Sequence, residues 1–150
     1  MLGLMAWVLG ALAAGWIGSQ FMPGEWYASL VKPPWTPPNA VFGPVWTVLY
    51  VLMGVAAWMV WRKAGFTGAA GPLTLFITQL VLNSLWSYLF FGAQQPMWAF
   101  FEILVLWVVI VITMLGFWRV RMAAGALLIP YVCWVGFASV LNLQLWRLNG

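Results

Sequence analysis

Histidine is absent from the 150-residue chain, which also holds only one cysteine and two acidic residues. The usual general base and the commonest metal ligand are therefore missing. One cysteine and two acids cannot form a zinc, di-iron or facial-triad site, so no metal site is predicted. No Ser–His or Cys–His pair is possible, and no glycine-rich loop precedes a Lys-Ser/Thr pair. Conventional catalysis is therefore not expected, and histidine could not hold a haem iron.

Charge is also scarce, since charged residues make up 5% of the chain and hydrophobic residues 65%. A soluble domain carries about a quarter charged residues, so this chain cannot cover a water-facing surface and its solvent is expected to be the lipid bilayer. The net charge of +4 comes from scattered Lys and Arg. No basic stripe with interleaved polar residues exists, so a nucleic acid partner is not expected.

Five apolar stretches are long enough to cross a membrane, which takes about 20 mostly apolar residues. They predict an all-α membrane protein, a five-transmembrane-helix bundle in a single domain over residues 1–150. The short connections make neighbouring helices antiparallel. Four of the six Lys and Arg residues fall on the side of the N-terminus, which the positive-inside rule places in the cytoplasm. The predicted helices cover roughly residues 2–21, 40–61, 72–92, 97–118 and 125–146.

The first loop, residues 22–38, is rich in proline and tryptophan. Proline fixes its own φ and restricts the residue before it, so this loop is expected to be extended and stiff. Trp26, Tyr27 and Trp35 are candidates for an aromatic belt at the lipid headgroups. The alternative is that the loop folds back as a lid over a pocket between helices.

Polar and aromatic residues recur at helical spacing in three of the expected spans, and such residues in a membrane face the bundle interior. Two interpretations stay open: the amides join helices by hydrogen bonds, or the three stripes line an apolar cavity with a few polar groups, as in a small-molecule site. Glu102 is the only acid within a span, which makes it a candidate functional residue. The alternative is a position near the membrane interface, where it is protonated or paired with a neighbouring helix. The stripes are Trp46, Tyr50, Met53, Gly54 and Ala57; Gln79, Asn83, Trp86, Ser87 and Phe90; and Tyr131, Trp134, Ala138, Leu141 and Asn142.

The most distinctive run of the sequence is WYASLVKPPWTPP at residues 26–38, followed by FGPVWTVLY at 42–50. Later runs of the same kind are QLVLNSLWS at 79–87, FFGA at 90–93, PYVCW at 130–134 and FASVLN at 137–142. With these runs the chain resembles the translocator protein (TspO) family, also called tryptophan-rich sensory proteins or peripheral benzodiazepine receptors. The chain lacks a basic C-terminal tail, which makes it similar to the bacterial members.

This resemblance implies a five-helix bundle, commonly a homodimer, with a ligand pocket beneath the first loop. It implies a multi-pass receptor or transporter-like protein of the bacterial cell membrane that binds porphyrins, such as protoporphyrin IX, and other hydrophobic ligands. A regulatory role in tetrapyrrole metabolism follows, with no cofactor required. The ligand-binding positions implied are Ser19, Met22, Phe42, Gly43, Val45, Trp46, Tyr50, Asn83, Trp86, Ser87, Phe90, Trp98, Trp134, Ala138 and Leu141.

Two other functions remain alternatives at this stage. Relatives in bacteria are credited with light-dependent porphyrin breakdown, which would make Trp46 and Trp134 the catalytic residues. The other alternative is a sterol-binding or purely structural membrane bundle. Animal members carry a cholesterol-recognition tyrosine near the end of the last helix, where this chain has Leu143 and Gln144. That difference argues against tight cholesterol binding.

Overall fold

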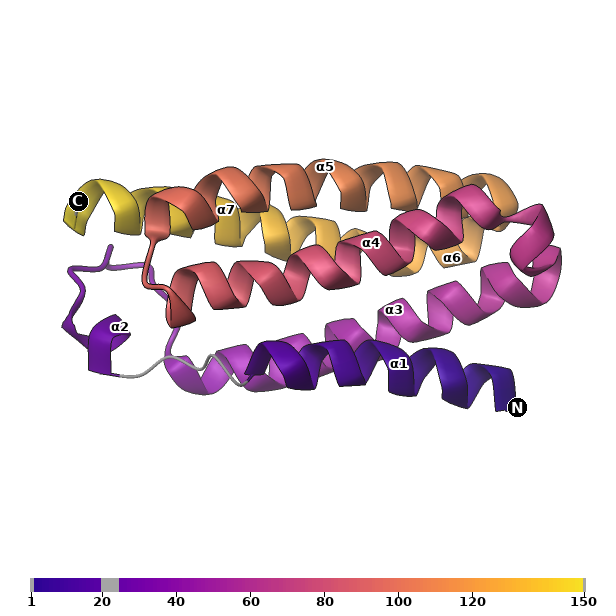
Figure 1. The fold of residues 1–150 in the computed structure, drawn as a ribbon, viewed down its shortest axis with the longest axis horizontal. Helices are drawn as coiled ribbons and strands as arrows, with labels where there is room; N and C mark the ends of the chain where they lie inside the picture. Colours follow the sequence, from indigo (N-terminus) through magenta and orange to yellow (C-terminus); the bar gives the residue numbers. More distant parts are fainter. Residues whose placement is uncertain (1, 20–24, 150) are drawn as a thin grey trace.

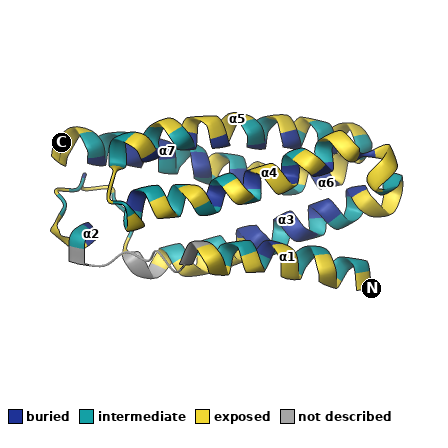
Figure 2. Cartoon of the chain, viewed as in Figure 1, coloured by how far each residue is buried: buried dark blue, intermediate teal, exposed yellow. Residues whose placement is uncertain are grey.

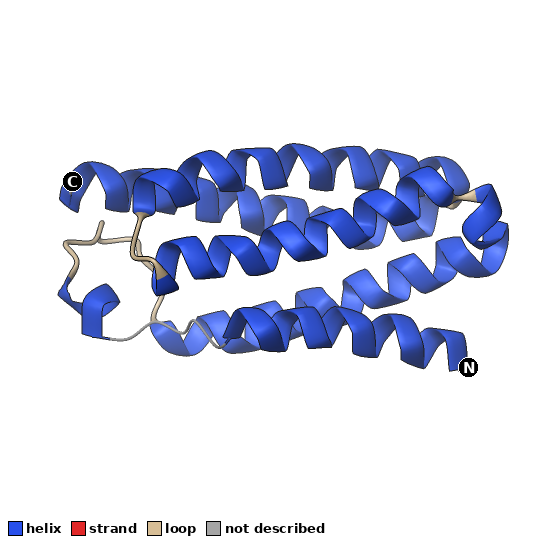
Figure 3. Ribbon diagram, viewed as in Figure 1, coloured by secondary structure: helices blue, strands red, loops and turns tan. Residues whose placement is uncertain are grey.

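The computed structural model describes residues 2–19 and 25–149, which fold into an elongated bundle of helices (Figure 1). Within these residues there is no strand (Figure 3). The two ends of the described chain lie at opposite ends of the bundle. The elements are α1 (Leu2–Ser19), α2 (Glu25–Ser29), α3 (Asn39–Gly68), α4 (Ala70–Ser87), a π-helical turn η1 (Tyr88–Gly92), α5 (Pro96–Val120), α6 (Met122–Leu127) and α7 (Ile129–Asn149).

Four helical segments are long and apolar enough to cross a membrane, namely residues 41–68, 70–92, 96–120 and 122–149. The chain is therefore a multi-pass membrane protein. The described apolar part of α1, Leu2–Ile17, is shorter than these four. The structure thus establishes an all-helical protein with four candidate spans, where the sequence predicts five.

Several helices extend past the predicted ends. The sequence predicts that the second long helix ends at Trp61, but α3 continues to Gly68 and bends at Gly65, where φ is +68° and ψ is 173°. This conformation is essentially restricted to glycine. Gly65 therefore turns the chain inside a nearly continuous helix, in place of the connection predicted between residues 61 and 72.

The last predicted helix, residues 125–146, is divided in the structure. It begins as the short α6 and breaks at Leu128, just before α7 with Pro130 in its first turn. Proline is favoured in a first helical turn and has no backbone N–H, so Pro130 cannot donate to the Ala126 carbonyl oxygen and the series of helical hydrogen bonds is interrupted here. At its other end α7 continues to Asn149.

The helices pack through small residues on their inner faces. Gly54 of α3 lies so close to α1 that an added Cβ would stand 2.5 Å from the Val8 Cα atom. Close backbone approach of this kind is how helices associate in lipid. Figure 2 shows buried residues along the inner faces and exposed ones outside. The exposed stripe on α5 is apolar (Leu104, Val108, Ile112 and Leu115), as a lipid-facing surface requires.

The described part of the first loop covers one end of the bundle, beside the C-terminal end of α7 (Figure 1). Asn149 joins the two. The Val31 backbone N–H donates to Asn149 Oδ1 at 2.8 Å, and Asn149 Nδ2 donates to the Val31 carbonyl oxygen at 2.8 Å. The loop is thus tied to the last residue of α7 by a two-way amide contact.

Candidate ligand-binding cavity

A cavity of about 410 Å³ lies at the loop end of the bundle, between α1, α3, α4 and α7. This volume falls within the range of small-molecule sites, roughly 300–1,000 Å³. None of the described residues that line it carries a charge. The lining residues are Leu12, Gly15, Trp16, Tyr27, Phe42, Gly43, Trp46, Thr47, Tyr50, Asn83, Trp86, Ser87, Phe90, Phe91, Trp134, Phe137, Ala138, Leu141, Asn142 and Leu145.

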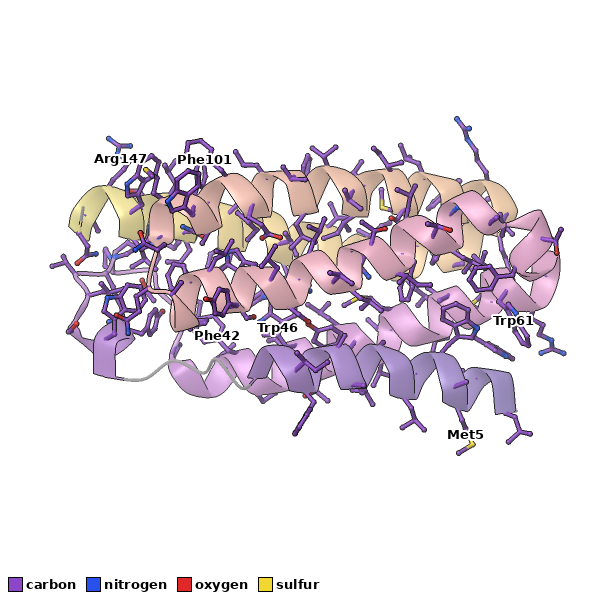
Figure 4. The ribbon with its side chains drawn as sticks, viewed as in Figure 1. Met5, Phe42, Trp46, Trp61, Phe101 and Arg147 are labelled. Carbon is purple, nitrogen blue, oxygen red and sulfur yellow. The ribbon has the colours of Figure 1, made fainter. Side chains whose placement is uncertain are left out.

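One wall of the cavity is built from aromatic rings of α3 and α7. Trp46 and Trp134 meet edge to face, with centroids 6.3 Å apart and planes at 88°. Phe42 packs against Trp134 at 6.1 Å, and Phe137 lies 5.6 Å from the same indole. Figure 4 shows Phe42 and Trp46 on the side of α3 that faces α4. These rings present flat apolar surfaces in several orientations.

The opposite wall comes from the end of α4 and from η1. Trp86 stacks on Phe90, with centroids 5.3 Å apart and planes at 24°. The π-helical turn closes with a bond from the Ala93 N–H to the Tyr88 carbonyl oxygen, five residues back. Such a turn shifts the faces of the residues within it, and here both Phe90 and Phe91 line the cavity. π-Helical turns occur frequently at functional sites.

The amides of the predicted stripes hold helices together at the cavity's edge. Asn142 Oδ1 accepts from Trp86 Nε1 at 2.9 Å, and Asn142 Nδ2 donates to the Pro96 carbonyl oxygen at 2.8 Å. Asn83 Nδ2 donates to the Tyr131 hydroxyl at 2.7 Å, which in turn donates to Gln79 Oε1 at 2.5 Å. Asn83 and Asn142 also line the cavity, so both interpretations of the stripes describe part of their role.

The loop supplies the cover of the cavity. Tyr27 of α2 is 2% exposed and lines the cavity, with its ring against Phe90 and Phe91. Trp35 packs edge to face on Phe137 at 5.6 Å. Of the three loop aromatics proposed for a membrane belt, Tyr27 is instead buried inside the protein.

The structure brings most of the predicted binding positions to one place. Val45 and Trp98 are not among the lining residues, and Trp98 is 58% exposed on α5. Met22 and the side chain of Ser19 lie outside the described residues. Whether any of these positions binds a ligand stays a prediction. Those that line the cavity are Phe42, Gly43, Trp46, Tyr50, Asn83, Trp86, Ser87, Phe90, Trp134, Ala138 and Leu141.

Several lining residues were not predicted as binding positions. Phe137 and Leu145 of α7 extend the face of Trp134 and Leu141, and a longer count of helical spacing finds them. Phe91 follows Asn83 and Ser87 at intervals of four residues, so the same count finds it too. Helical spacing does not identify Tyr27, because this residue reaches the cavity only through the inward fold of the loop.

Glu102 of α5 does not line the cavity. Both of its carboxylate oxygens are buried, and neither has a hydrogen-bond partner in the described part of the chain. Burial of an unpaired charge is costly. As a whole residue Glu102 is only partly buried, and it lies apart from the candidate cavity.

The arrangement is suited to holding a flat, mostly apolar molecule. Its walls are aromatic, its few polar groups are amides and hydroxyls, and it offers no charged group for acid–base chemistry among the described lining residues. The described residues also contain no group of three or more Cys, Asp or Glu that could hold a metal ion.

Comparison with known proteins adds an independent observation. Residues 6–147 match the model of the TspO/MBR family. The chain is 46% identical over 145 residues to the tryptophan-rich protein TspO of Chlorobaculum tepidum, covering 92% of this chain and 90% of that protein. It is 41% identical over 150 residues to the human translocator protein, covering 97% and 89%. It is 39% identical over 132 residues to the tryptophan-rich sensory protein of Cereibacter sphaeroides, covering 88% and 82%.

Proposed function

The chain belongs to the TspO/MBR family, and we propose that it binds porphyrins and other flat hydrophobic molecules in the cavity beneath its first loop. Its role would be that of a membrane receptor or transporter-like protein that regulates tetrapyrrole metabolism. The observation that carries this proposal is the aromatic wall formed by Trp46, Trp134 and Phe42. Indole faces suit flat conjugated rings.

The rest of the cavity supports the same class of ligand. A porphyrin is wider than one indole, and the opposing Trp86–Phe90 stack supplies a second aromatic surface from another helix. The lid aromatics Tyr27 and Trp35 close the end of the cavity. No metal ligand is required, because a free porphyrin is held by stacking and by contacts to its substituents.

The proposed setting of the site is a five-span bundle in a bacterial cell membrane. Here α1 is the fifth span, since it runs beside α3 along much of the bundle (Figure 1). The α3–α4 and α5–α6 junctions lie at the N-terminal end of the bundle, and the first loop and the end of α7 lie at the other end (Figure 1). The first end is therefore that of Arg62, Lys63, Arg119 and Arg121, and the second that of Lys32 and Arg147. The positive-inside rule assigns the N-terminus to the cytoplasm. We also propose a homodimer.

The test is a titration of the detergent-solubilised protein with protoporphyrin IX in darkness, followed by quenching of tryptophan fluorescence. We expect saturable quenching. Replacement of Trp46 or Trp134 by Phe narrows the aromatic wall and is expected to weaken binding several-fold. Trp118, which is 42% exposed and does not line the cavity, gives a matched control as Trp118→Phe. Absence of saturation in the parent protein would reject the proposal.

A second candidate function is light-dependent porphyrin breakdown with dioxygen as the oxidant. The observation in its favour is the contact of Trp46 with three oxidisable rings, at 5.8 Å from Tyr50, 6.3 Å from Tyr131 and 6.3 Å from Trp134. Bleaching of bound porphyrin under light, dependent on dioxygen and lost in Trp46→Phe and Trp134→Phe, would establish this function. Equal bleaching in parent and variants would assign the loss to the free pigment.

A further inference from the structure

The Tyr27 hydroxyl is a buried polar group that nothing in the described part of the chain satisfies. Its oxygen is inaccessible and has no hydrogen-bond partner there, and the whole residue is 2% exposed. Buried polar side-chain atoms in proteins are nearly always hydrogen-bonded, so an exception calls for an explanation such as a ligand. Tyr27 lines the candidate cavity, which is where such a ligand would lie.

The ring of Tyr27 is held in place by its neighbours. Phe91 packs against it at 5.6 Å and Phe90 at 6.2 Å, both edge to face. Turning the hydroxyl out to solvent would break both contacts. The ring is therefore fixed on the lid, where Tyr27 borders the cavity.

The hydroxyl is a donor under ordinary conditions. Burial raises the pKa of Tyr27 above its usual value of 10.0, so the phenol stays protonated at neutral pH. A protonated phenol offers one O–H to an acceptor. The complementary ligand group at this point is an oxygen that accepts a hydrogen bond.

A positive charge lies beside the same ring. Lys32 Nζ stands 4.7 Å from the centroid of Tyr27 and donates to the carbonyl oxygens of Ala28 and Leu30, which hold it on the lid. The described cavity lining has no charged residue of its own. The lid end is thus the place where a negative charge on a ligand is stabilised best.

We infer that the Tyr27 hydroxyl donates a hydrogen bond to a carboxylate of the ligand, so that the site selects flat hydrophobic acids over their neutral analogues. This inference rests on the proposed function and deepens it. The walls hold the ring system of the ligand, and the lid recognises its acidic substituent. The inference gives the ligand an orientation, with its carboxylates toward α2 and its apolar edge toward the bundle centre.

The experiment compares three porphyrins in the dark: protoporphyrin IX, its dimethyl ester, and etioporphyrin, which carries no oxygen. Each is titrated into the parent protein, Tyr27→Phe, and Tyr88→Phe. Tyr88 is 46% exposed and does not line the cavity, so this control removes a hydroxyl elsewhere. Etioporphyrin also reports whether the cavity of Tyr27→Phe is intact, because its binding needs only the walls.

We expect Tyr27→Phe to weaken protoporphyrin IX binding about tenfold, equivalent to about 1.4 kcal/mol. The ester should lose less, etioporphyrin nothing, and Tyr88→Phe should match the parent for all three. Equal affinity of parent and Tyr27→Phe for protoporphyrin IX would overturn the inference and leave the proposed function standing. An equal loss for all three porphyrins would also overturn it, because the hydroxyl would then serve the fold. If the parent binds none of the three, the proposed function fails as well.

Discussion

The contact between Asn149 and Val31 offers a direct test of the loop as a lid. Replacing Asn149 by alanine removes both hydrogen bonds between the end of α7 and the loop, each 2.8 Å long. It also removes the bond from Asn149 Nδ2 to the Leu145 carbonyl oxygen, but leaves the apolar contacts of Tyr27 and Trp35 in place. The change therefore loosens the lid without altering the cavity walls.

The size of the effect follows from these bonds. A neutral hydrogen bond contributes about 0.5–1.5 kcal/mol net, with exposed bonds near the lower end. Both loop contacts are exposed, so their loss should cost about 1–2 kcal/mol of lid closure. That corresponds to an opening equilibrium raised by roughly five- to thirtyfold.

Two measurements follow the opening. Hydrogen exchange at the Val31 amide, which loses its own acceptor in Asn149→Ala, should accelerate by at least this factor with no ligand present. Release of bound protoporphyrin IX, followed by fluorescence after dilution, should accelerate by a similar factor if release requires the open lid. Leu148→Ala is the matched control, because Leu148 is the preceding residue of the same helix and is 47% exposed.

The result that would refute the reasoning is unchanged exchange at Val31 in Asn149→Ala. The hydrogen bonds between Asn149 and Val31 would then contribute nothing to the free energy of lid closure. Faster exchange with unchanged porphyrin release would confirm that these bonds hold the lid, but would show that the ligand leaves by another path.

Three further variants test the bundle. Gly54→Ala should lower the apparent melting temperature in detergent, because its Cβ would stand 2.5 Å from the Val8 Cα atom and overpacking costs about 1–3 kcal/mol. The control is Gly10→Ala on α1, where a Cβ meets nothing within 4 Å, and it should leave the melting temperature unchanged. Gly65→Ala should also destabilise the protein, by about 1–3 kcal/mol, because of its glycine-only backbone conformation; the control is Gly71→Ala, and equal melting of the two variants would contradict the prediction. Glu102→Gln should melt no lower than the parent and bind protoporphyrin IX unchanged, because it removes an unpartnered buried acid away from the cavity; weaker binding would place Glu102 in the function.

The helical spacing of the sequence predicts the cavity's walls well. Asn83, Trp86 and Phe90 fall on one face of α4 and η1, and all three line the cavity. Spacing works here because a membrane leaves few places for amides, so the polar face of a span is the inner face. Helical spacing does not distinguish an amide that joins helices from one that lines a cavity. Asn142 has both roles.

The features that spacing missed depend on contacts between distant residues. The pairing of Asn149 with Val31 joins positions 118 residues apart, and the sequence around either residue does not predict it. The inward fold of Tyr27 rests on its ring contacts with Phe90 and Phe91, which lie far from it in the sequence. The sequence predicts a helix end at Trp61, whereas the structure has a bend at Gly65. The reason is different here, because glycine permits a turn without showing whether the surrounding helix stops.

The hydrogen bonds around the cavity indicate which groups would supply the affinity for a ligand and which would set its orientation. Asn142 uses both ends of its amide within the bundle, and the Asn83 amide donates to Tyr131. The Thr47 hydroxyl donates to the Gly43 carbonyl oxygen. These groups are engaged before any ligand arrives, so they offer a ligand little further hydrogen bonding. The Tyr27 hydroxyl on the lid has no such partner in the described residues. Asn149→Ala, which opens the lid, should therefore reduce the discrimination between acidic and neutral porphyrins. The affinity for etioporphyrin, which the walls provide, should fall less.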